Sequence, residues 1–488
     1  MSALLLLAPL LLPWLAAGVL LSLRRRPAAQ VLSATWIFGG LEIGALGALV
    51  VAAARHAQAW SDYLRADALT AFFLLTTGLV FGLVLLYAAG YMRRVPPGRF
   101  ASLPWFYALL FVFLGTIVGV YLAANLGLMW ILMEGTTLAS VLLVGFYNTQ
   151  RAVEAGWKYL IVCTVGLALG LFGTIAFYLA AVRGGVGTAH ALDWLTLLRN
   201  AKHLGNTPRL LELGWVFLAV GYGTKVGLVP MHSWLPDAHA EAPSPVSAML
   251  SAALLNCALY ALIRFQEIAS GALGSAYSRH VLLALGLVSA LVGAMLMLVQ
   301  RDLKRLFAYS SIEHMGIVAT GLGLGGAWGV YGALLQILNH ALAKCLMFFA
   351  AGNVRERYHE ARMVRIRGLG TTMPLTAAAL VLGGVALAGL PPFGLFASEF
   401  AILRQAFDHH PAAGLLLLAL LSVVFAALAR HLQGMLGGRP VVPPTGPGEA
   451  TGGLVAMGIC LALLLLLGLH LPGSVHSLLQ RAVAVIRS

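Results

Sequence analysis

Five ionisable side chains lie inside long apolar stretches of this 488-residue chain, where a charge is costly. They are Glu134 and Lys225 in one half, and His340, Lys344 and Glu399 in the other. Such residues at membrane depth are by default functional, each with a partner. A buried glutamate and a buried lysine offset each other's desolvation, and adding a proton to the carboxylate removes their attraction. We interpret these residues as a switchable proton or cation path, with a static structural ion pair as the alternative.

Prolines lie beside the charges in two of these stretches. Pro230 and Pro236 follow Lys225, and the pair Pro391 and Pro392 precedes Glu399. A proline removes a helical hydrogen bond, and interrupted membrane helices next to a charge are typical of ion sites at the middle of the bilayer. We therefore predict two broken helices at these positions.

Further polar residues are candidates for proton relay or uptake. His232 and His239 follow the first break, where they either form a funnel from the cytoplasm or satisfy loop backbone. Asn256 bridges water or serves as an interhelical hydrogen bond. Glu313 and His314 are adjacent in one helix, so we expect them to point in different directions and not to line one path together.

No cofactor chemistry is predicted for the chain itself. Its cysteines, Cys163, Cys257, Cys345 and Cys460, are scattered singly, and no CxxC pair exists. The Asp/His spacing after the first break lacks a third close ligand, so a metal site is not expected either.

The elements that must position these residues are membrane helices. The chain is 60% hydrophobic and 10% charged, with mean hydropathy +0.90, whereas soluble proteins carry about 25% charged residues. The composition excludes a soluble domain. The net charge of +14 is explained by basic loops on the cytoplasmic side of a membrane protein better than by nucleic acid. The distribution of arginine and lysine predicts that both termini face outside.

Apolar runs of about twenty residues each cross a hydrocarbon core and predict an all-α polytopic protein of about fourteen transmembrane helices. The predicted spans are approximately 4–23, 31–54, 68–91, 104–124, 126–147, 157–182, 213–231, 243–266, 280–299, 305–325, 328–352, 373–400, 412–436 and 452–472. The two broken helices, seventh and twelfth in this series, lie five spans apart. This spacing predicts an N-terminal three-helix segment (1–103), two five-helix repeats (104–267 and 268–436), and a linker, last helix and short tail (437–488).

Several motifs resemble the antiporter-like subunits of respiratory complex I and its relatives. The resemblance covers residues 65–435 and rests on Lys225, on the run from Pro230 through Ala248, and on Tyr260 and Arg264. Residues 302–311, the stretch from His340 to Lys344 and the stretch from Gly389 to Glu399 follow in the same order. Within this family the likeness is narrower to the component F-type subunit of hydrogenase-4 and related formate hydrogenlyase-type nickel–iron hydrogenases. Residues 147–150, 157–160, 255–260 and 313–315 carry it.

The resemblance implies inverted five-helix repeats and proton-translocating roles for Glu134, Lys225, Lys344 and Glu399. Many family members carry a lysine or histidine where this chain has Asn256, which puts the central link of the path in question. His314 or water is a possible substitute.

The resemblance also implies a bacterial inner-membrane subunit without cofactors, working with nickel–iron, iron–sulfur or quinone sites in partner subunits. A multi-subunit cation/proton antiporter, a CO2- or bicarbonate-accumulating complex and a purely structural subunit are the alternatives.

Overall fold

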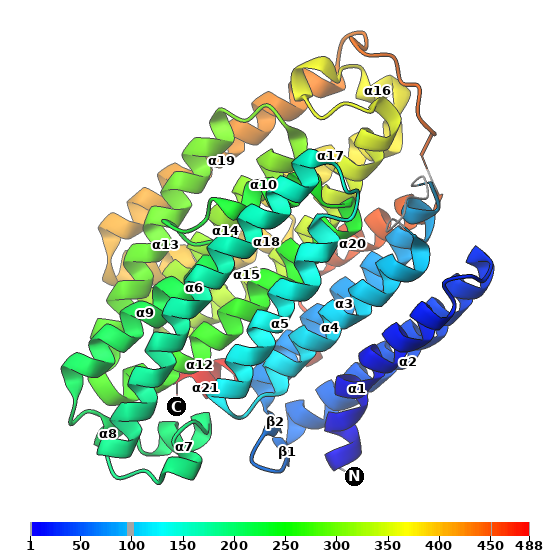
Figure 1. Cartoon of the computed structure of the whole chain (residues 1–488). Helices are drawn as coiled ribbons and strands as arrows, with labels where there is room; N and C mark the ends of the chain where they lie inside the picture. Colours follow the sequence, from blue (N-terminus) through cyan, green and yellow to red (C-terminus); the bar gives the residue numbers. More distant parts are fainter. Residues whose placement is uncertain (1, 95–101, 450, 488) are drawn as a thin grey trace.

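The computed structural model describes residues 2–94, 102–449 and 451–487. Long helices lie side by side along the whole chain (Figure 1), so the predicted all-α polytopic class is confirmed. The N-terminal part contains α1 (Ser2–Ser22), α2 (Ala28–Arg55), a hairpin of β1 (Gln58–Trp60) and β2 (Leu64–Ala66), α3 (Ala68–Tyr91) and the 3-10 turn η1 (Met92–Arg94). This antiparallel hairpin, in which Gln58 faces Ala66, was not predicted from the sequence.

The middle of the chain contains the next eleven elements. They are α4 (Leu103–Leu122), α5 (Leu126–Val144), α6 (Gln150–Arg183), η2 (Thr188–His190), α7 (Trp194–Arg199), α8 (Ala201–Leu204), α9 (Pro208–Val226), α10 (Trp234–Glu241), α11 (Ser244–Met249), the π-helical η3 (Leu250–Leu254) and α12 (Leu255–Leu273). Because α11, η3 and α12 follow one another without a gap, they form one helix with a π-turn inside it.

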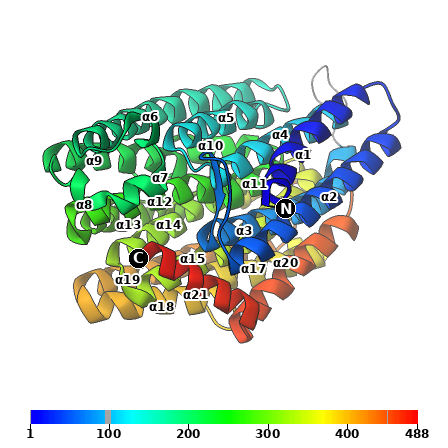
Figure 2. The same cartoon turned by 90° about the horizontal axis from the view of Figure 1, so that it is seen from below.

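The last part contains ten elements. They are α13 (Ser275–Leu298), α14 (Leu303–Leu324), α15 (Gly326–Tyr358), η4 (Met363–Arg365), α16 (Leu369–Thr372), α17 (Pro374–Leu387), α18 (Gly394–His409), α19 (Pro411–Leu436), α20 (Thr451–Leu469) and α21 (Gly473–Arg487). The predicted short tail is thus a further helix, α21. It packs against α3 and α15 and crosses the end of the bundle (Figure 2).

Within the described residues, eleven helices are long and apolar enough to cross a membrane. The other three predicted spans fall on α9, on α14 and on the pair α17 and α18. Both α9 and α14 contain charged residues, and the members of the pair are short. The total of fourteen spans and the repeat boundaries therefore stay predictions.

Two helices form the centre of the bundle. The apolar windows of the α11–η3–α12 helix and of α15 are buried throughout, whereas those of α1, α2 and α20 are only one-third buried. Elsewhere the helices approach closely through small residues. A Cβ added to Gly221 of α9 would lie 2.5 Å from the backbone nitrogen of Gly170 on α6. The polar residues of α15 are enclosed by protein because its whole apolar window is buried. Those of α14, such as Ser310, Glu313 and His314, are fully buried as well.

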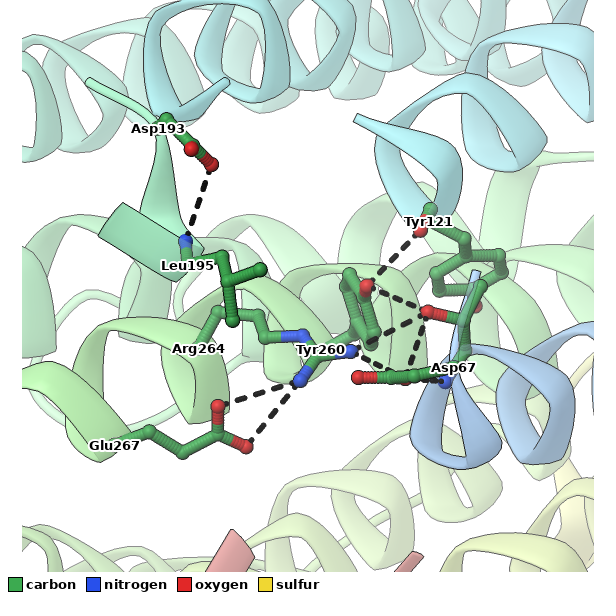
Figure 3. A network of polar contacts seen from close by, with 8 residues as sticks. Asp67, Tyr121, Asp193, Leu195, Tyr260, Arg264 and Glu267 are labelled. Atoms are coloured by element: carbon green, nitrogen blue, oxygen red, sulfur yellow. Dashed lines mark hydrogen bonds and ion pairs between the residues drawn. The ribbon is translucent and has the colours of Figure 1, made fainter. Parts of the chain in front are cut away.

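A buried arginine ties α12 to two loops at one end of the bundle (Figure 3). Arg264 is fully buried, and its Nη2 donates to Oδ1 of Asp67 at 2.6 Å, while Nη1 lies 3.3 Å from Oε2 of Glu267. Its guanidinium carbon also lies 4.3 Å from the ring centroid of Trp194 on α7. Arg264 therefore holds together the start of α3, the end of α12 and the loop around α7.

Asp67 contributes to this contact as a helix cap as well, because its Oδ1 accepts from the backbone nitrogen of Thr70 at 2.9 Å. Burial alone would raise the pKa of Asp67, but the Arg264 guanidinium and the hydrogen bonds from Thr70 hold it below the ordinary value. Ionised Asp67 therefore stabilises the folded protein at neutral pH. This contribution is lost as the pH falls through the lowered pKa of Asp67.

We expect the Arg264→Met variant to lose about 3–5 kcal/mol of stability, because it leaves Asp67 and Glu267 as buried charges without their cation. The measurement is thermal unfolding of the detergent-purified protein. Arg305→Met is the control, since Arg305 pairs with Asp237 at 2.7 Å but is 40% exposed, and such a pair is worth about 0–1 kcal/mol. Equal melting temperatures for the two variants would contradict the stabilising role assigned to Arg264.

Candidate functional site

Lys225 lies at the end of α9, one residue before the helix terminates. The helix ends at Val226 because Gly227 adopts a left-handed conformation, with φ of 86°, and closes the last turn through its backbone N–H. A Cβ at Gly227 would lie 2.5 Å from Cδ1 of Leu235, so a side chain there would clash. The fully buried lysine is thus placed where helix α9 stops.

The predicted role of the prolines at this break needs correction. The break begins at Gly227 and not at Pro230, which lies in the turn that follows. Pro236 does not break a helix at all, because it sits in the first turn of α10, where a missing N–H leaves no intrahelical bond unmade. Pro391 and Pro392 do lie in the predicted second break, between α17 and α18.

Neutral oxygens surround the ammonium group of Lys225. Its Nζ donates to Oγ1 of Thr137 at 2.5 Å and to the hydroxyl of Tyr159 at 2.9 Å, and lies 5.0 Å from the Tyr159 ring centroid. Among the ion pairs of the described residues none joins Lys225 to Glu134. Glu134 lies one turn before Thr137 on α5, half-buried, and interacts with Lys225 electrostatically. The expected direct pair is therefore replaced by a hydroxyl cradle.

Aromatic rings connect this cradle to the interior. The ring of Trp234 lies 4.7 Å from that of Tyr159, and its Nε1 donates to the backbone oxygen of Thr224 at 2.8 Å. His239 follows in α10, with its ring 6.2 Å from Trp234 and 5.5 Å from Phe348 of α15. The distances run between ring centroids. These rings form a series of contacts from α6 through α10 to α15.

The structure separates the two histidines that follow the first break. His232 is only partly buried, and its Nδ1 lies 3.2 Å from the carbonyl oxygen of Pro230. His239 is fully buried and interacts electrostatically with Lys304 and, to a smaller extent, with Lys344. Its Nδ1 lies 2.7 Å from the carbonyl oxygen of Leu235, and Nε2 has no hydrogen-bond partner in the described part of the chain. A funnel at the surface can include His232 but not His239.

Lys344 on α15 repeats the arrangement seen at Lys225. It is fully buried, and its Nζ donates to the backbone oxygen of Phe307 at 2.9 Å and to Oγ of Ser310. Both acceptors belong to α14. Lys225 and Lys344 are therefore both stabilised by uncharged oxygens of neighbouring helices. A third buried lysine, Lys304, donates to the backbone oxygen of Ala242 at 2.6 Å.

Glu399 lies at the second break, on α18. Its Oε1 accepts from Nε2 of Gln336 at 3.0 Å and lies 3.8 Å from Nδ1 of His314. The same Gln336 nitrogen is 3.1 Å from that histidine nitrogen, and Ser398 donates to Oε1 of Gln336. The carboxylate is packed against Gly389, where any added Cβ would overlap it. Gln336 thus connects Glu399 to His314.

Glu313 and His314 lie closer together than their positions on the helix predict. Nδ1 of His314 is 3.5 Å from Oε2 of Glu313, and both side chains are fully buried. Neither oxygen of Glu313 has a hydrogen-bond partner among the residues described. The two side chains thus approach each other instead of pointing apart as expected. Flexible side chains on a helix enclosed by α13, α15 and α18 can curve toward the same space.

His340 is the fully buried residue that lies next to this cluster. Its ring centroid is 5.5 Å from that of His314, and it interacts electrostatically with Lys344 and His239. Within the described ranges, neither ring nitrogen has a hydrogen-bond partner. Buried polar groups of this kind are commonly satisfied by ordered water.

Asn256 does not connect the two halves by direct contact. Its Nδ2 donates to the backbone oxygen of Ala252 at 2.6 Å, which lies in the π-turn of its own helix, and its Oδ1 has no partner in the described part. In the same π-turn, Ser251 reaches Ser311 of α14 at 2.8 Å between hydroxyl oxygens.

The sequence reasoning missed Asp67 and Glu267, which bind Arg264, and also a buried acid without such a partner. Glu42 of α2 is fully buried, and neither carboxylate oxygen has a partner among the described side chains and backbone. The signal was available, because Glu42 is a single carboxylate in an apolar stretch, as Glu134 is. Thr137 and Tyr159 were missed for a different reason, since nothing in the sequence marks an ordinary hydroxyl as a lysine partner. Among the residues described, no three His, Cys, Asp or Glu side chains gather as a metal site.

Residues 123–426 match the family described as NADH:quinone oxidoreductase/Mrp antiporter, transmembrane. A hydrogenase-4 component F homolog from Methylacidiphilum infernorum is 44% identical over 315 residues, 64% of this chain and 66% of the relative. An NAD(P)H-quinone oxidoreductase chain 4 from Thermosynechococcus vestitus is 34% identical over 346 residues, 70% of this chain and 60% of the relative. The matches thus span less than two thirds of these relatives.

The fold has solved counterparts. A chain in the structure of the membrane-bound sulfane sulfur reductase, an archaeal respiratory membrane complex, superposes with a TM-score of 0.86 at 23% identity, covering 99% of this chain and 97% of the other. The resemblance expected from the motifs is confirmed. The chain belongs to the NADH:quinone oxidoreductase/Mrp antiporter family of membrane proteins.

Proposed function

We propose that the chain is the proton-translocating membrane subunit of a redox-driven complex of the complex I or membrane-bound hydrogenase type. Membership in the family supports this function. The observation that carries it is the buried succession of polar groups from Lys225 through His239 to His340, Lys344 and Glu399. Charges of this kind inside a membrane protein mark ion paths and proton relays.

Protons are taken up near His232, the more exposed of the two histidines after the first break. They reach Lys225 through its cradle of Thr137 and Tyr159. Because these partners are neutral, Lys225 can lose its proton without leaving a buried carboxylate unpaired. Glu134 modulates this loading electrostatically from the same helix as Thr137.

His239 passes the proton between the two halves. Its ring neighbour Trp234 is hydrogen-bonded beside Lys225, whereas its electrostatic neighbours Lys344 and His340 lie in the second half. This role compensates for Asn256, which holds its own helix backbone. In the second half, the proton passes through the buried cluster of Lys344, Glu313, His314 and His340. Glu399 is the last acid before release.

The coupling is electrostatic. Adding one charge beside another in a low-dielectric interior is worth several kcal/mol, so a proton on Lys225 changes the proton affinity of the next group. Redox chemistry takes place elsewhere, in partner subunits that hold nickel–iron, iron–sulfur or quinone sites. The chain binds none of these groups in this proposal.

We further propose a bacterial inner-membrane location with both termini outside. Basic loops gather at one end of the bundle, where Asp302 pairs with Arg362 in a backbone bridge and Arg94 lies 3.2 Å from Glu356. Both termini lie toward the opposite end (Figure 1). This arrangement supports the cytoplasmic assignment of the basic end.

The division into repeats at 104–267 and 268–436, after the N-terminal segment 1–103 and before the linker and tail 437–488, belongs to the same proposal. The first repeat holds one buried lysine, Lys225, and the second holds two, Lys304 and Lys344, all donating to neutral oxygens. Each repeat also holds one helix break containing a left-handed glycine. These glycines are Gly227 and Gly389.

Gentle purification of the tagged chain followed by mass spectrometry tests the assembly. We expect subunits with nickel–iron or iron–sulfur centres, or quinone-reductase subunits. Recovery of only small membrane proteins would favour a cation/proton antiporter, which the family also includes. Recovery of a zinc-bearing soluble partner would favour a CO2-accumulating complex, and either result would contradict the redox-driven assignment.

We expect Lys225→Ala to abolish proton pumping by the assembled complex in inverted membrane vesicles, because the first loading site is lost. Electron transfer and subunit composition are measured in the same preparation. Lys158→Ala is the matched control, since Lys158 pairs with Asp237 at 2.5 Å at the surface and is 42% exposed. Normal pumping by an assembled Lys225→Ala complex would exclude the proposed path.

We expect His239→Leu to slow pumping by about tenfold or more, equivalent to at least roughly 1.4 kcal/mol on the barrier, because the transfer between the halves loses its titratable group. His232→Leu is the comparison, seven residues earlier and near the surface, with a smaller expected loss. The initial rate of acidification in the same vesicles is the measurement. If the two variants lose activity equally, His239 has no central role.

A further inference from the structure

A cavity of about 620 Å³ opens at the end of the bundle that contains α7, α8 and the C-terminal helix. Its walls come from the loop helices α7 and α8, from the end of α12, from the start of α13 and from α21. This end is where α12 and α14 stop and where α13 and α15 begin, so the cavity lies at the border between apolar and polar surroundings. Its volume is in the range of small-molecule sites, about 300–1,000 Å³.

Basic side chains dominate the polar part of the lining. Arg199, Lys202, Arg279 and Arg487 line the cavity, and none of them takes part in a salt bridge within the described residues. The single carboxylate in the lining is Glu267, which Arg264 already binds at 3.3 Å. Among the described residues, the cavity therefore gathers basic side chains that have no salt-bridge partner.

Two features indicate a preformed binding site. The Arg279 guanidinium lies against Gly325, since its carbon is 2.7 Å from where a Cβ on that glycine would stand. Gln266 is 94% buried, lines the cavity, and its Oε1 has no hydrogen-bond partner in the described part of the chain. An unpartnered buried carboxamide oxygen needs a donor, such as a hydroxyl group.

The rest of the lining contains two serines, Ser270 and Ser275, and an apolar part that includes Leu198, Leu322, Val330 and Ile486. The basic residues suit a phosphate, Gln266 suits a hydroxyl group, and the apolar wall suits a hydrocarbon part of the same molecule. Arginine suits phosphate because its guanidinium donates two parallel hydrogen bonds.

We propose that this cavity binds a phosphate-bearing anion, with the headgroup of an anionic glycerophospholipid as its ligand. The phosphate contacts Arg199, Lys202, Arg279 and Arg487, a headgroup hydroxyl donates to Gln266, and the acyl part lies against the apolar wall. A bound lipid connects the C-terminal helix α21 to α12 and to the α7–α8 loop. This site is separate from the proposed proton path.

The test is calorimetric titration of the full, delipidated, detergent-purified chain. The probes are dioctanoyl phosphatidylglycerol, dioctanoyl phosphatidylcholine and inorganic phosphate. We expect phosphatidylglycerol to bind, and to bind about tenfold more weakly to the triple variant Arg199→Gln, Lys202→Gln and Arg279→Gln. The control triple variant Arg151→Gln, Arg183→Gln and Arg209→Gln removes the same charge from exposed positions outside the cavity, and its affinity should match that of the unmodified chain.

Ser275→Glu provides a second variant that removes no contact, because Ser275 is exposed in the cavity wall. It should weaken phosphatidylglycerol binding by repulsion even if the triple variant fails to fold. If inorganic phosphate binds as tightly as the lipid, the cavity is an anion site, but its ligand is free phosphate and not a lipid headgroup. Equal binding of phosphatidylglycerol and phosphatidylcholine, or equal losses in the cavity and control variants, would overturn the proposal.

Discussion

The cost of burying ammonium groups determines most of what surrounds the centre of this protein. Lys225 and Lys344 are both fully buried, and both donate to uncharged oxygens of neighbouring helices. A buried cation without partners would be expelled or neutralised. The hydroxyls of Thr137, Tyr159 and Ser310 and the carbonyl of Phe307 therefore have to be in place, and the packing of α5, α6 and α14 against the lysine helices follows from that requirement.

The two lysine sites are far apart in sequence but are joined by one short helix. Because α9 ends at Gly227, the chain re-enters the bundle as α10 and brings Trp234 and His239 between the halves. The break consequently does two things, since it ends the lysine helix and inserts an aromatic and titratable bridge next to α15.

The sequence was sufficient for the membrane class, for the family and for the ionisable residues that stand out against apolar surroundings, such as Lys225 and Glu399. It was insufficient where an arrangement depends on tertiary packing. Glu313 and His314 share one space because three helices enclose them. The first break starts at a glycine rather than a proline because Leu235 packs against Gly227. Hydroxyl partners such as Thr137 carry no distinguishing mark in a sequence, and Glu42 was overlooked although the criterion used for Glu134 applied to it.

The π-turn η3 has a mechanical consequence. The helix that contains it is fixed at its far end, where Arg264 binds Asp67 and Glu267 and packs on Trp194. Its other end enters from the α10 side, after Pro243. That end is held too, because α11 packs against α15 and α3. A rod that is held at both ends and has one irregular turn concentrates bending and twisting at that turn. The helix is thus expected to behave as a hinged lever whose joint lies beside Ser311 and Asn256, the level at which the two halves of the bundle meet.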